Sequence, residues 1–366
     1  MSSTVIGLDI GATGIRAAEI TKGPRGTHLR RFAFAPLAEG TLSAGRVLDA
    51  DALASALREL WSRGKFSSKQ VALGLGDDSV VVRQLDLDWM PEDHFRQALR
   101  YQVADVVPLP VDEANLDHIL LDDLEVVDAE SGETRRVARI LLVAAPRDLV
   151  DGMVRAVESA GLRVVRADLA PLALIRASSG GSTTRATGGT GGTEAIVDIG
   201  AETVTTTVHR DGRPIFVRFL PGLGGASLTR ALQNEFDWTF DEAERTKRAS
   251  GLLASARHPD DPAPLEHPAQ HLLTDLAVEL VDEVRATLAF SLDTYDEPSA
   301  QLDRVVLTGG GAHLGGLAHL TETVLGVPVV QLDQPTGLRG RGRSPIAQDA
   351  AGVSVLATGL ALGGVA

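Results

Sequence analysis

The chain has 366 residues, a net charge of −14 at pH 7 and no cysteine. The absence of thiols excludes disulfide bonds, thiolate catalysis and zinc–thiolate sites, and the acidic balance argues against a nucleic-acid-binding protein. An apolar content of 44% fits a globular protein with more than one core. We expect neither a signal peptide nor a membrane-spanning stretch.

The chain opens on an apolar run that ends in Asp9 and is followed by a glycine-rich turn and a second apolar run to Ile20. This pattern predicts a β-hairpin whose turn holds Gly11, Ala12, Thr13 and Gly14. The N–H groups of such a turn can bind a phosphate, and Asp9 is placed to hold a metal ion or its bound water nearby.

The segment between residues 36 and 145 is predicted to be an inserted α/β subdomain. Its pattern indicates helices over 51–62 and from Pro91 to about 106, strands over 70–75 and 80–87, and a hairpin of 116–127 with 136–145. Such an insertion is either purely structural or carries a partner surface. Four apolar residues are candidates for a partner groove, although core packing is the favoured role for each: Leu85, Leu87, Phe95 and Leu99.

Three further segments complete the first half. We predict a helix over 148–160, a strand over 163–168 and a helix over 169–177. Residues 178–193 contain only Gly, Ser, Thr, Ala and one Arg, which is typical of a flexible linker.

The second half repeats the opening pattern. An apolar strand ends in Asp198 and is followed by the turn residues Gly200, Ala201, Glu202 and Thr203. A glycine pair, Gly224-Gly225, precedes a helix that ends near Phe236, and helix N-termini favour anions. We also predict helices over 240–249, 272–295, 314–325 and 347–362, and strands over 215–220, 302–307 and 327–331.

A third glycine cluster follows the strand 302–307. Two matching hairpins about half a chain apart, together with this cluster, suggest two related halves that close on one ligand. The cluster consists of Gly309, Gly310, Gly311 and Ala312.

These three motifs resemble those of the actin/Hsp70/hexokinase superfamily, and the whole chain resembles its PilM family of actin-like ATPases in type IV pilus assembly. The PilM resemblance extends to four further stretches: 87–91, 107–108, 160–162 and 358–362. It implies an α/β, actin-like (ribonuclease H-like) fold of two domains with a nucleotide cleft between them. The expected units are a first core of 1–35 plus 146–177, the insertion 36–145, the linker 178–193, a second half of 194–352, and a closing helix and tail of 353–366.

The resemblance implies that ATP and Mg²⁺ bind between the halves, with Asp9 and Asp198 acting through metal-bound water. It implies that both hairpin turns and the Gly224-Gly225 pair contact the phosphates. Glu244 and Lys247 would contact ribose and adenine, although such a pair is commonly a surface ion pair. Residues 309–312 would form the adenosine turn. Arg16 would support the phosphates or be a solvated charge.

One departure from the family concerns hydrolysis. The PilM-like pattern Asp-x-Glu-Ala-x-Ala-Leu reads here as 168–174, with Ala170 at the glutamate position. Asp168 remains as a weaker candidate for a catalytic carboxylate. Because a water-positioning group contributes strongly to phosphoryl transfer, we expect slow hydrolysis or ATP held as a structural ligand.

The resemblance implies a cytoplasmic scaffold at the inner face of the cell membrane, docked there through the N-terminal peptide of a PilN-like membrane protein and linked to other pilus machinery. Alternatives within the superfamily are an active ATPase or small-molecule kinase, and an FtsA-like filament-forming protein. FtsA ends in an amphipathic membrane helix, whereas residues 360–364 here lack basic amphipathic character. Self-association is a further expectation.

Overall fold

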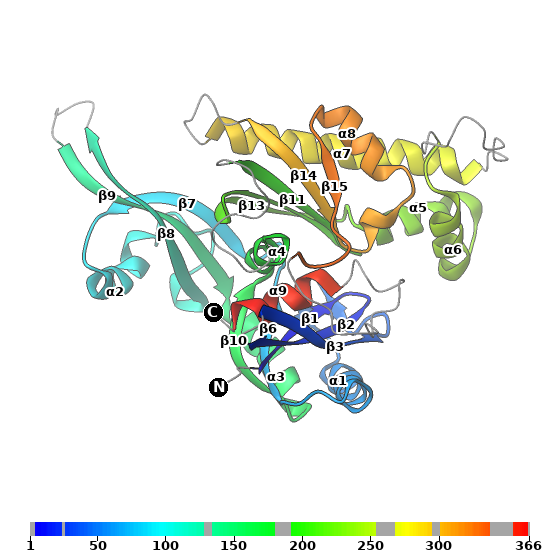
Figure 1. Ribbon diagram of the computed structural model, residues 1–366, viewed down its shortest axis with the longest axis horizontal. Coiled ribbons are helices and arrows are strands. Elements are labelled where there is room, and N and C mark those ends of the chain that lie inside the picture. Colours follow the sequence, from blue (N-terminus) through cyan, green and yellow to red (C-terminus); the bar gives the residue numbers. More distant parts are fainter. Residues whose placement is uncertain are drawn as a thin grey trace.

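The computed structural model describes residues 4–23, 26–127, 134–179, 192–253, 268–294, 301–336 and 354–364. Most of the predicted linker and the first part of the predicted helix 347–362 lie outside these ranges. Within them the chain forms two five-stranded sheets and a smaller three-stranded sheet (Figure 1). In the described segments, no helix combines the length and apolarity needed to cross a membrane.

The first large sheet has the strand order β10-β6-β1-β2-β3. Its strands are β1 (Thr4–Gly11), β2 (Gly14–Gly23), β3 (Gly26–Pro36), β6 (Gln70–Leu75) and β10 (Arg163–Leu169). Strands β1 and β2 are antiparallel, whereas β6 pairs with both β1 and β10 in parallel. Side chains from alternate strand positions pack against α1 (Ala50–Gly64) and α3 (Arg147–Ser159) to form one core.

The second large sheet has the order β13-β12-β11-β14-β15. Its strands are β11 (Thr193–Ile199), β12 (Thr203–Arg210), β13 (Arg213–Pro221), β14 (Leu302–Thr308) and β15 (Val329–Gln331). Four helices belong to this half: α5 (Gly225–Phe236), α6 (Phe240–Ser250), α7 (Pro268–Thr294) and α8 (Leu317–Leu325). Its β11–β12–β13 meander and parallel β14 repeat the pattern of the first sheet, which agrees with the prediction of two related halves.

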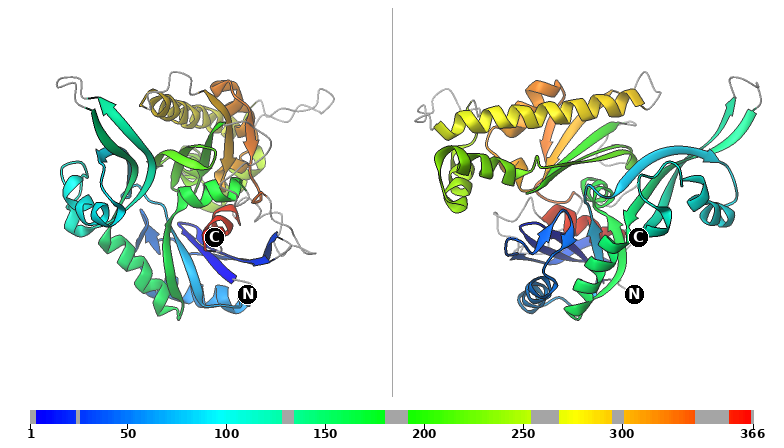
Figure 2. Two further views of the ribbon diagram at one scale, coloured as in Figure 1. Left: turned by 60° about the vertical axis from the view of Figure 1, so that its left-hand side comes forward. Right: turned by 180° about the vertical axis from the view of Figure 1, so that it is seen from behind.

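Two helices lie between the large sheets, α4 (Ala170–Ser178) and α9 (Val355–Gly363) (Figures 1 and 2). Helix α9 contacts β1, β2 and β6, while α4 shares a core cluster with Ile196 of β11 and Val306 of β14. The two helices also contact each other closely. They therefore connect the halves.

The inserted unit is smaller than the predicted 36–145. Strand β6 belongs to the first large sheet and α1 packs on that sheet, so residues 50–75 are part of the first core. The unit that projects from it is the sheet β7-β9-β8 with α2 (Figure 2). Its elements are β7 (Val81–Asp88), α2 (Glu92–Gln102), β8 (Ala114–Val127) and β9 (Thr134–Pro146). Parallel pairing between strands distant in the chain is not visible in a local pattern.

The remaining elements are short. They are β4 (Leu42–Ser43), β5 (Arg46–Val47) and the 3₁₀ turns η1 (Val111–Glu113) and η2 (Gly311–His313). Turn η2 separates β14 from α8, so α8 begins three residues later than predicted. Helix α2 ends at Gln102, earlier than the predicted end near 106.

Candidate functional site

The first hairpin has the predicted turn. Gly11 pairs with Gly14, so Ala12 and Thr13 form its tip and are exposed. Asp9 lies directly opposite Arg16 in the β1–β2 register, with 3.6 Å between Asp9 Oδ2 and Arg16 Nη1. Burial raises the pKa of Asp9, while the charge of Arg16 and a hydrogen bond from it oppose that rise.

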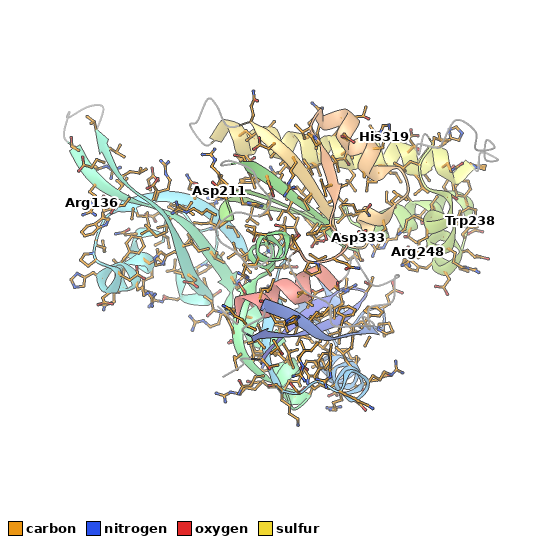
Figure 3. All side chains as sticks on the ribbon, in the orientation of Figure 1. Arg136, Asp211, Trp238, Arg248, His319 and Asp333 are labelled. Carbon is orange, nitrogen blue, oxygen red and sulfur yellow. The ribbon has the colours of Figure 1, made fainter. Side chains whose placement is uncertain are left out.

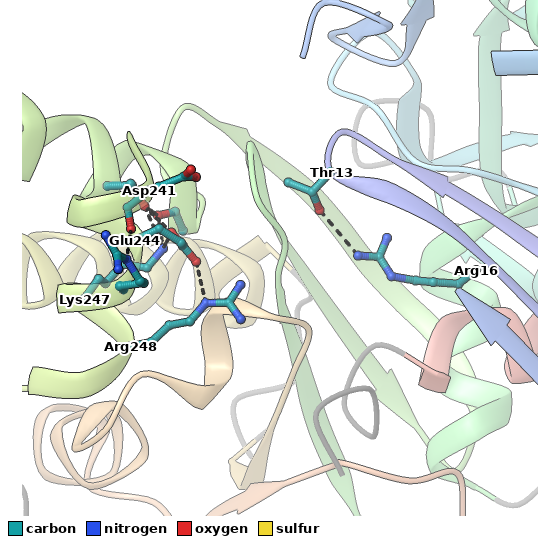
Figure 4. A network of polar contacts seen from close by, with 9 residues as sticks. Thr13, Arg16, Asp241, Glu244, Lys247 and Arg248 are labelled. Atoms are coloured by element: carbon teal, nitrogen blue, oxygen red, sulfur yellow. Dashed lines mark hydrogen bonds and ion pairs between the residues drawn. The ribbon is translucent and has the colours of Figure 1, made fainter. Parts of the chain in front are cut away.

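The Arg16 side chain extends from β2 back to the hairpin turn and is not a solvated charge. Its side chain is 13% exposed, and its guanidinium donates to the Gly14 carbonyl oxygen at 3.1 Å. A longer contact of 3.5 Å reaches Thr13 Oγ1 (Figure 4). The Phe34 ring lies 5.4 Å from the guanidinium carbon, measured to the ring centroid. Arg16 therefore stiffens the turn from within and adds positive charge beside Asp9.

The second hairpin presents Asp198 at the matching position. Asp198 pairs with Thr205 of β12 and Thr308 of β14. Its pKa is raised to about 7, mainly by burial and also by the charge of Asp9, while the charge of Arg16 opposes the rise. Asp9 and Arg16 belong to the other half. Their effect on the pKa of Asp198 means that the two aspartates lie within electrostatic range of each other across the halves.

The turn of the second hairpin is held by the start of α5. The amide of Gly225 donates to the Gly200 carbonyl oxygen at 2.9 Å, and that of Ala226 donates to the Ala201 carbonyl oxygen at 2.8 Å. A Cβ at Gly224 would lie 2.3 Å from the Ala201 oxygen, so only glycine allows this approach. These two amides are committed to the turn and are not open donors for a phosphate.

The other predicted turn residues are also engaged. Glu202 forms an ion pair with Arg230 of α5, with 2.5 Å between Glu202 Oε1 and Arg230 Nη2. Thr203 takes part through its backbone: its carbonyl oxygen accepts a hydrogen bond from the Gly200 amide at 3.0 Å and closes the turn. The turn is thus a compact unit fixed to α5 at several points.

Glu244 and Lys247 lie together on α6, beneath the start of α5 (Figure 4). Lys247 Nζ lies 2.6 Å from Glu244 Oε2 and 2.8 Å from both the Gly225 carbonyl oxygen and Thr229 Oγ1. Burial would raise the pKa of Glu244, but hydrogen bonds from Lys247, Thr229 and Arg248 lower it to about 2. The pair is a partly buried network rather than a surface ion pair.

The third glycine cluster packs directly against the second hairpin. Gly309 has a φ of +86°, and a Cβ there would lie 2.3 Å from Asp198 Oδ1. Gly311 lies against the side chain of Ile199, and Ala312 is buried in the core of the second half. Gly310 precedes the η2 turn. The third glycine cluster and the second hairpin therefore meet at Asp198.

A cavity of about 280 Å³ opens beside this cluster and is lined by residues 312–316, Ala318, His319 and Gln331. The Gln331 amide donates to the Ala312 carbonyl oxygen at 3.1 Å. Figure 3 shows His319 on α8 and Asp333 near the end of β15, whereas Arg248 lies on α6. The cavity is thus on the α8 side of the glycine cluster.

Asp168 belongs to a different network. Arg166 Nη2 lies 3.0 Å from Asp168 Oδ2, and Arg176 donates to the same oxygen in a short contact. Both arginines also donate to carbonyl oxygens at the end of α9, at Leu360, Gly363 and Gly359. This arrangement gives Asp168 a structural role in fixing α9 and does not favour the catalytic role that the sequence left open.

Ala170 is the first residue of α4 and is 9% exposed. Its Cβ lies 2.9 Å from the position that a Cβ on Gly76 would take.

The four apolar residues of the insertion take the favoured core role: Phe95 and Leu99 are buried between α2 and the sheet, and Leu85 and Leu87 pack against them.

Sequence reasoning missed three residues of the site: Thr229, Arg230 and Arg248. Two of them, Thr229 and Arg248, had a local signal. Thr229 follows Gly225 by four residues on α5, and Arg248 follows Glu244 by four on α6, spacings that place side chains on one helix face. The contact of Arg230 with Glu202 depends on the fold and had none.

A family model described as type IV pilus assembly protein PilM matches residues 7–365. A structure of a PilM–PilN type IV pilus biogenesis complex has a chain 25% identical to this one, at a TM-score of 0.82, with 99% of this chain and 98% of that chain covered.

More distant structures share the fold. The ethanolamine utilization protein EutJ from Carboxydothermus hydrogenoformans is 17% identical, at a TM-score of 0.51, over 98% of this chain and 89% of that chain. MreB5 of Spiroplasma citri bound to ADP is 12% identical, at a TM-score of 0.51, over 96% and 94%. With two hairpins of one pattern in two related halves and a family match over nearly its full length, the chain belongs to the PilM family of type IV pilus assembly proteins.

Proposed function

We propose that this protein is an ATP-binding scaffold of type IV pilus assembly that links a PilN-like membrane protein to the cytoplasmic machinery and hydrolyses ATP slowly or not at all. The observation that carries the proposal is the position of Asp9 and Asp198 on matching hairpins, where the charge of Asp9 acts on Asp198 and the third glycine cluster lies against Asp198. Family membership and the likeness to a PilM–PilN complex chain support the scaffold role.

The aspartate pair suits a divalent cation. Burial and the charge of Asp9 raise the pKa of Asp198 to about 7, and burial also raises the pKa of Asp9. A hard cation such as Mg²⁺ takes oxygen ligands and removes this repulsion when bound. In the proposal Asp9 and Asp198 hold Mg²⁺ through water, and the phosphates lie along the turns at 11–14 and 200–203.

Slow hydrolysis follows from residues 168 and 170. Ala170 offers no carboxylate to position a water molecule, and the carboxylate of Asp168 is bound by two arginines. The proposal therefore assigns ATP a structural role. The scaffold would act in the cytoplasm and bind the N-terminal peptide of the PilN-like partner.

The test combines calorimetry with a phosphate-release assay on three proteins: wild type, Asp9→Ala and the exposed-surface control Asp51→Ala. We expect Mg²⁺-ATP to bind to wild type and to the control, and binding to Asp9→Ala to weaken at least about tenfold. Phosphate release should stay far below the usual enzyme range of about 1–1000 per second.

A second arm titrates a synthetic peptide of a PilN-like N-terminus into the ATP-bound protein. Binding of the peptide without turnover supports the scaffold. Rapid phosphate release would instead show an active ATPase, and the absence of ATP binding to wild type would remove the nucleotide from the proposal while leaving the peptide arm to decide the scaffold role.

A further inference from the structure

We propose that the inserted unit, which consists of α2 and the sheet β7-β9-β8, is a strap that holds the two halves together. Its chain connections join it to the first half, while β13 of the second half fastens it at two separate points. The strap therefore limits how far the halves can move apart about the crossing of α4 and α9. This inference goes beyond the proposed function, because it concerns the protein without any ligand.

The inserted unit is joined to the rest of the chain along one edge. Residues 76–80 lead from β6 of the first sheet into β7, and β9 continues directly into α3, which packs on the same sheet. The two connections lie next to each other, since Val81 of β7 pairs with Ala144 of β9. Two adjacent connections can act as a hinge, so the orientation of the unit must be fixed by contacts elsewhere.

The first of these contacts is an apolar cluster at the base of the unit. Val80 and Ala145 come from the two connections and Leu169 comes from the end of β10, and all three are buried. Phe219 of β13 packs against them and is the member of this cluster from the second half. A Cβ added to Gly76 would lie 3.8 Å from Phe219 Cε1, so the ring also reaches the segment that leads into the unit. The base of the inserted unit is therefore packed on both halves.

The second contact is a hydrogen bond farther out on the unit. Arg213, the first residue of β13, donates from Nη2 to the Leu121 carbonyl oxygen at 2.6 Å. Leu121 lies at a bulge in β8, where the pairing with β9 shifts between Leu120 and Asp122. The extra residue of a bulge is left out of the strand pairing, so its carbonyl oxygen is available to another partner. The bulge thus gives the second half a point of attachment on β8.

The distance between the two contacts decides which movements they can oppose. Arg213 and Phe219 are six residues apart on one strand, which corresponds to about 20 Å at about 3.3 Å per residue. A single contact would allow the unit to rotate about it, whereas two contacts this far apart oppose both separation and rotation. Figure 1 shows β7 alongside β13, and the two strands are in contact.

The experiment measures the distance between the halves by double electron–electron resonance of two spin labels. Because the chain has no cysteine, Asp51→Cys on α1 and Glu279→Cys on α7 supply the labelled thiols, one in each half. Both positions are exposed. The pair is introduced into four proteins without nucleotide: the otherwise unchanged chain, Arg213→Met, Phe219→Ala and the control Arg218→Met.

Arg218 is the matched control because it is an exposed residue of the same strand, and its side chain forms no hydrogen bond or ion pair within the described part of the chain. We expect Arg213→Met to raise the fraction of molecules with longer distances about fivefold, the scale of one lost hydrogen bond. Phe219→Ala should raise it further, whereas Phe219→Leu, which keeps an apolar side chain, should raise it less. Arg218→Met should leave the distances unchanged.

A second label pair separates a strap from simple docking. It joins Glu125→Cys on β8, an exposed position of the inserted unit, to Glu279→Cys on α7. Both label pairs should shift in Arg213→Met and Phe219→Ala. A shift of the second pair alone would mean that the unit docks on the second half without limiting its movement, and this would overturn the inference, as would unchanged distances in both pairs.

Thermal unfolding of each labelled protein checks that the variants are folded. If Phe219→Ala does not fold, Arg213→Met still decides the inference, because Arg213 is exposed and its replacement removes no core packing. Since no nucleotide is present, the result is the same whether or not the protein binds ATP, and failure of the proposed function leaves this test intact.

Discussion

At the scale of single residues, the site is defined by two aspartates that the fold brings within electrostatic range of each other. Asp9 and Asp198 each end a strand at a hairpin, and each has a raised pKa because it is removed from water. Arg16 offsets part of this cost for both carboxyls. The protein therefore carries a local energetic penalty at the position where the proposed cation would bind.

Replacing Asp198 with Asn tests this penalty through the pH dependence of stability. The folded pKa of about 7 lies above the value of about 3.9 for an unfolded aspartate. The unfolded chain therefore loses this proton first, and the contribution of Asp198 to stability falls as pH rises from about 4 to 7. The side-chain amide of the Asp198→Asn variant does not ionise, so the variant does not lose this stability as pH rises.

We expect Asp198→Asn to raise the free energy of unfolding relative to wild type at pH 8, by at most about 4 kcal/mol, and to change it far less at pH 4. Urea denaturation without nucleotide or Mg²⁺ at both pH values measures this difference. The same change at both values would show that Asp198 is not held as an acid in the folded protein.

At the scale of elements, the two halves are joined by the crossing of α4 and α9. Gly359 of α9 lies so close to α4 that an added Cβ would be 2.0 Å from the Ala173 carbonyl oxygen. At the end of α9, Arg166 and Arg176 bind its last carbonyl oxygens, and Asp168 forms ion pairs with both arginines. The crossing thus depends on close backbone packing at one point and on buried charge at another.

Gly359→Ala should destabilise the protein by about 1–3 kcal/mol or more, because the added methyl group meets backbone that cannot rotate away. Gly152→Ala on α3 is the matched control: it is also a helical glycine, but nothing lies within 4 Å of its added Cβ. The control should gain about 0.4–1 kcal/mol. Urea unfolding measures both, and a neutral Gly359→Ala would contradict this packing.

At the scale of the whole molecule, the site is shared between halves that each have their own core. In the proposed function, aspartates from both sheets face one ligand. A ligand that binds only the folded, assembled site stabilises it by mass action, by about 2.7 kcal/mol at a concentration 100 times its Kd.

Mg²⁺-ATP should therefore raise the thermal unfolding midpoint by several degrees, and both Asp9→Ala in the first half and Asp198→Ala in the second should cut the rise to about half or less. Differential scanning fluorimetry with Mg²⁺-ATP, ATP with a chelator, and Mg²⁺ alone makes the comparison. An undiminished rise in either variant would mean that one half binds the nucleotide by itself.

The sequence alone determined the features that depend on local pattern. Alternating apolar residues and glycine turns predicted both hairpins, so Asp9 and Asp198 were found at the ends of their strands. The order of most helices and strands followed in the same way, as did the core role of Phe95 and Leu99. The periodicity of apolar side chains and the residue types of a turn are properties of neighbouring residues, so they can be recognised in the sequence alone.

Only the tertiary structure decided contacts between residues distant in the chain. It assigned β6 to the first sheet rather than to the insertion, gave Asp168 its two arginines, and enclosed Lys247 between α5 and α6. Each depends on parallel pairing or on packing between separate helices, for which a local pattern holds no information. The sequence does not show whether the side chain of a carboxylate or a lysine binds a ligand or already has its hydrogen-bond partners within the protein.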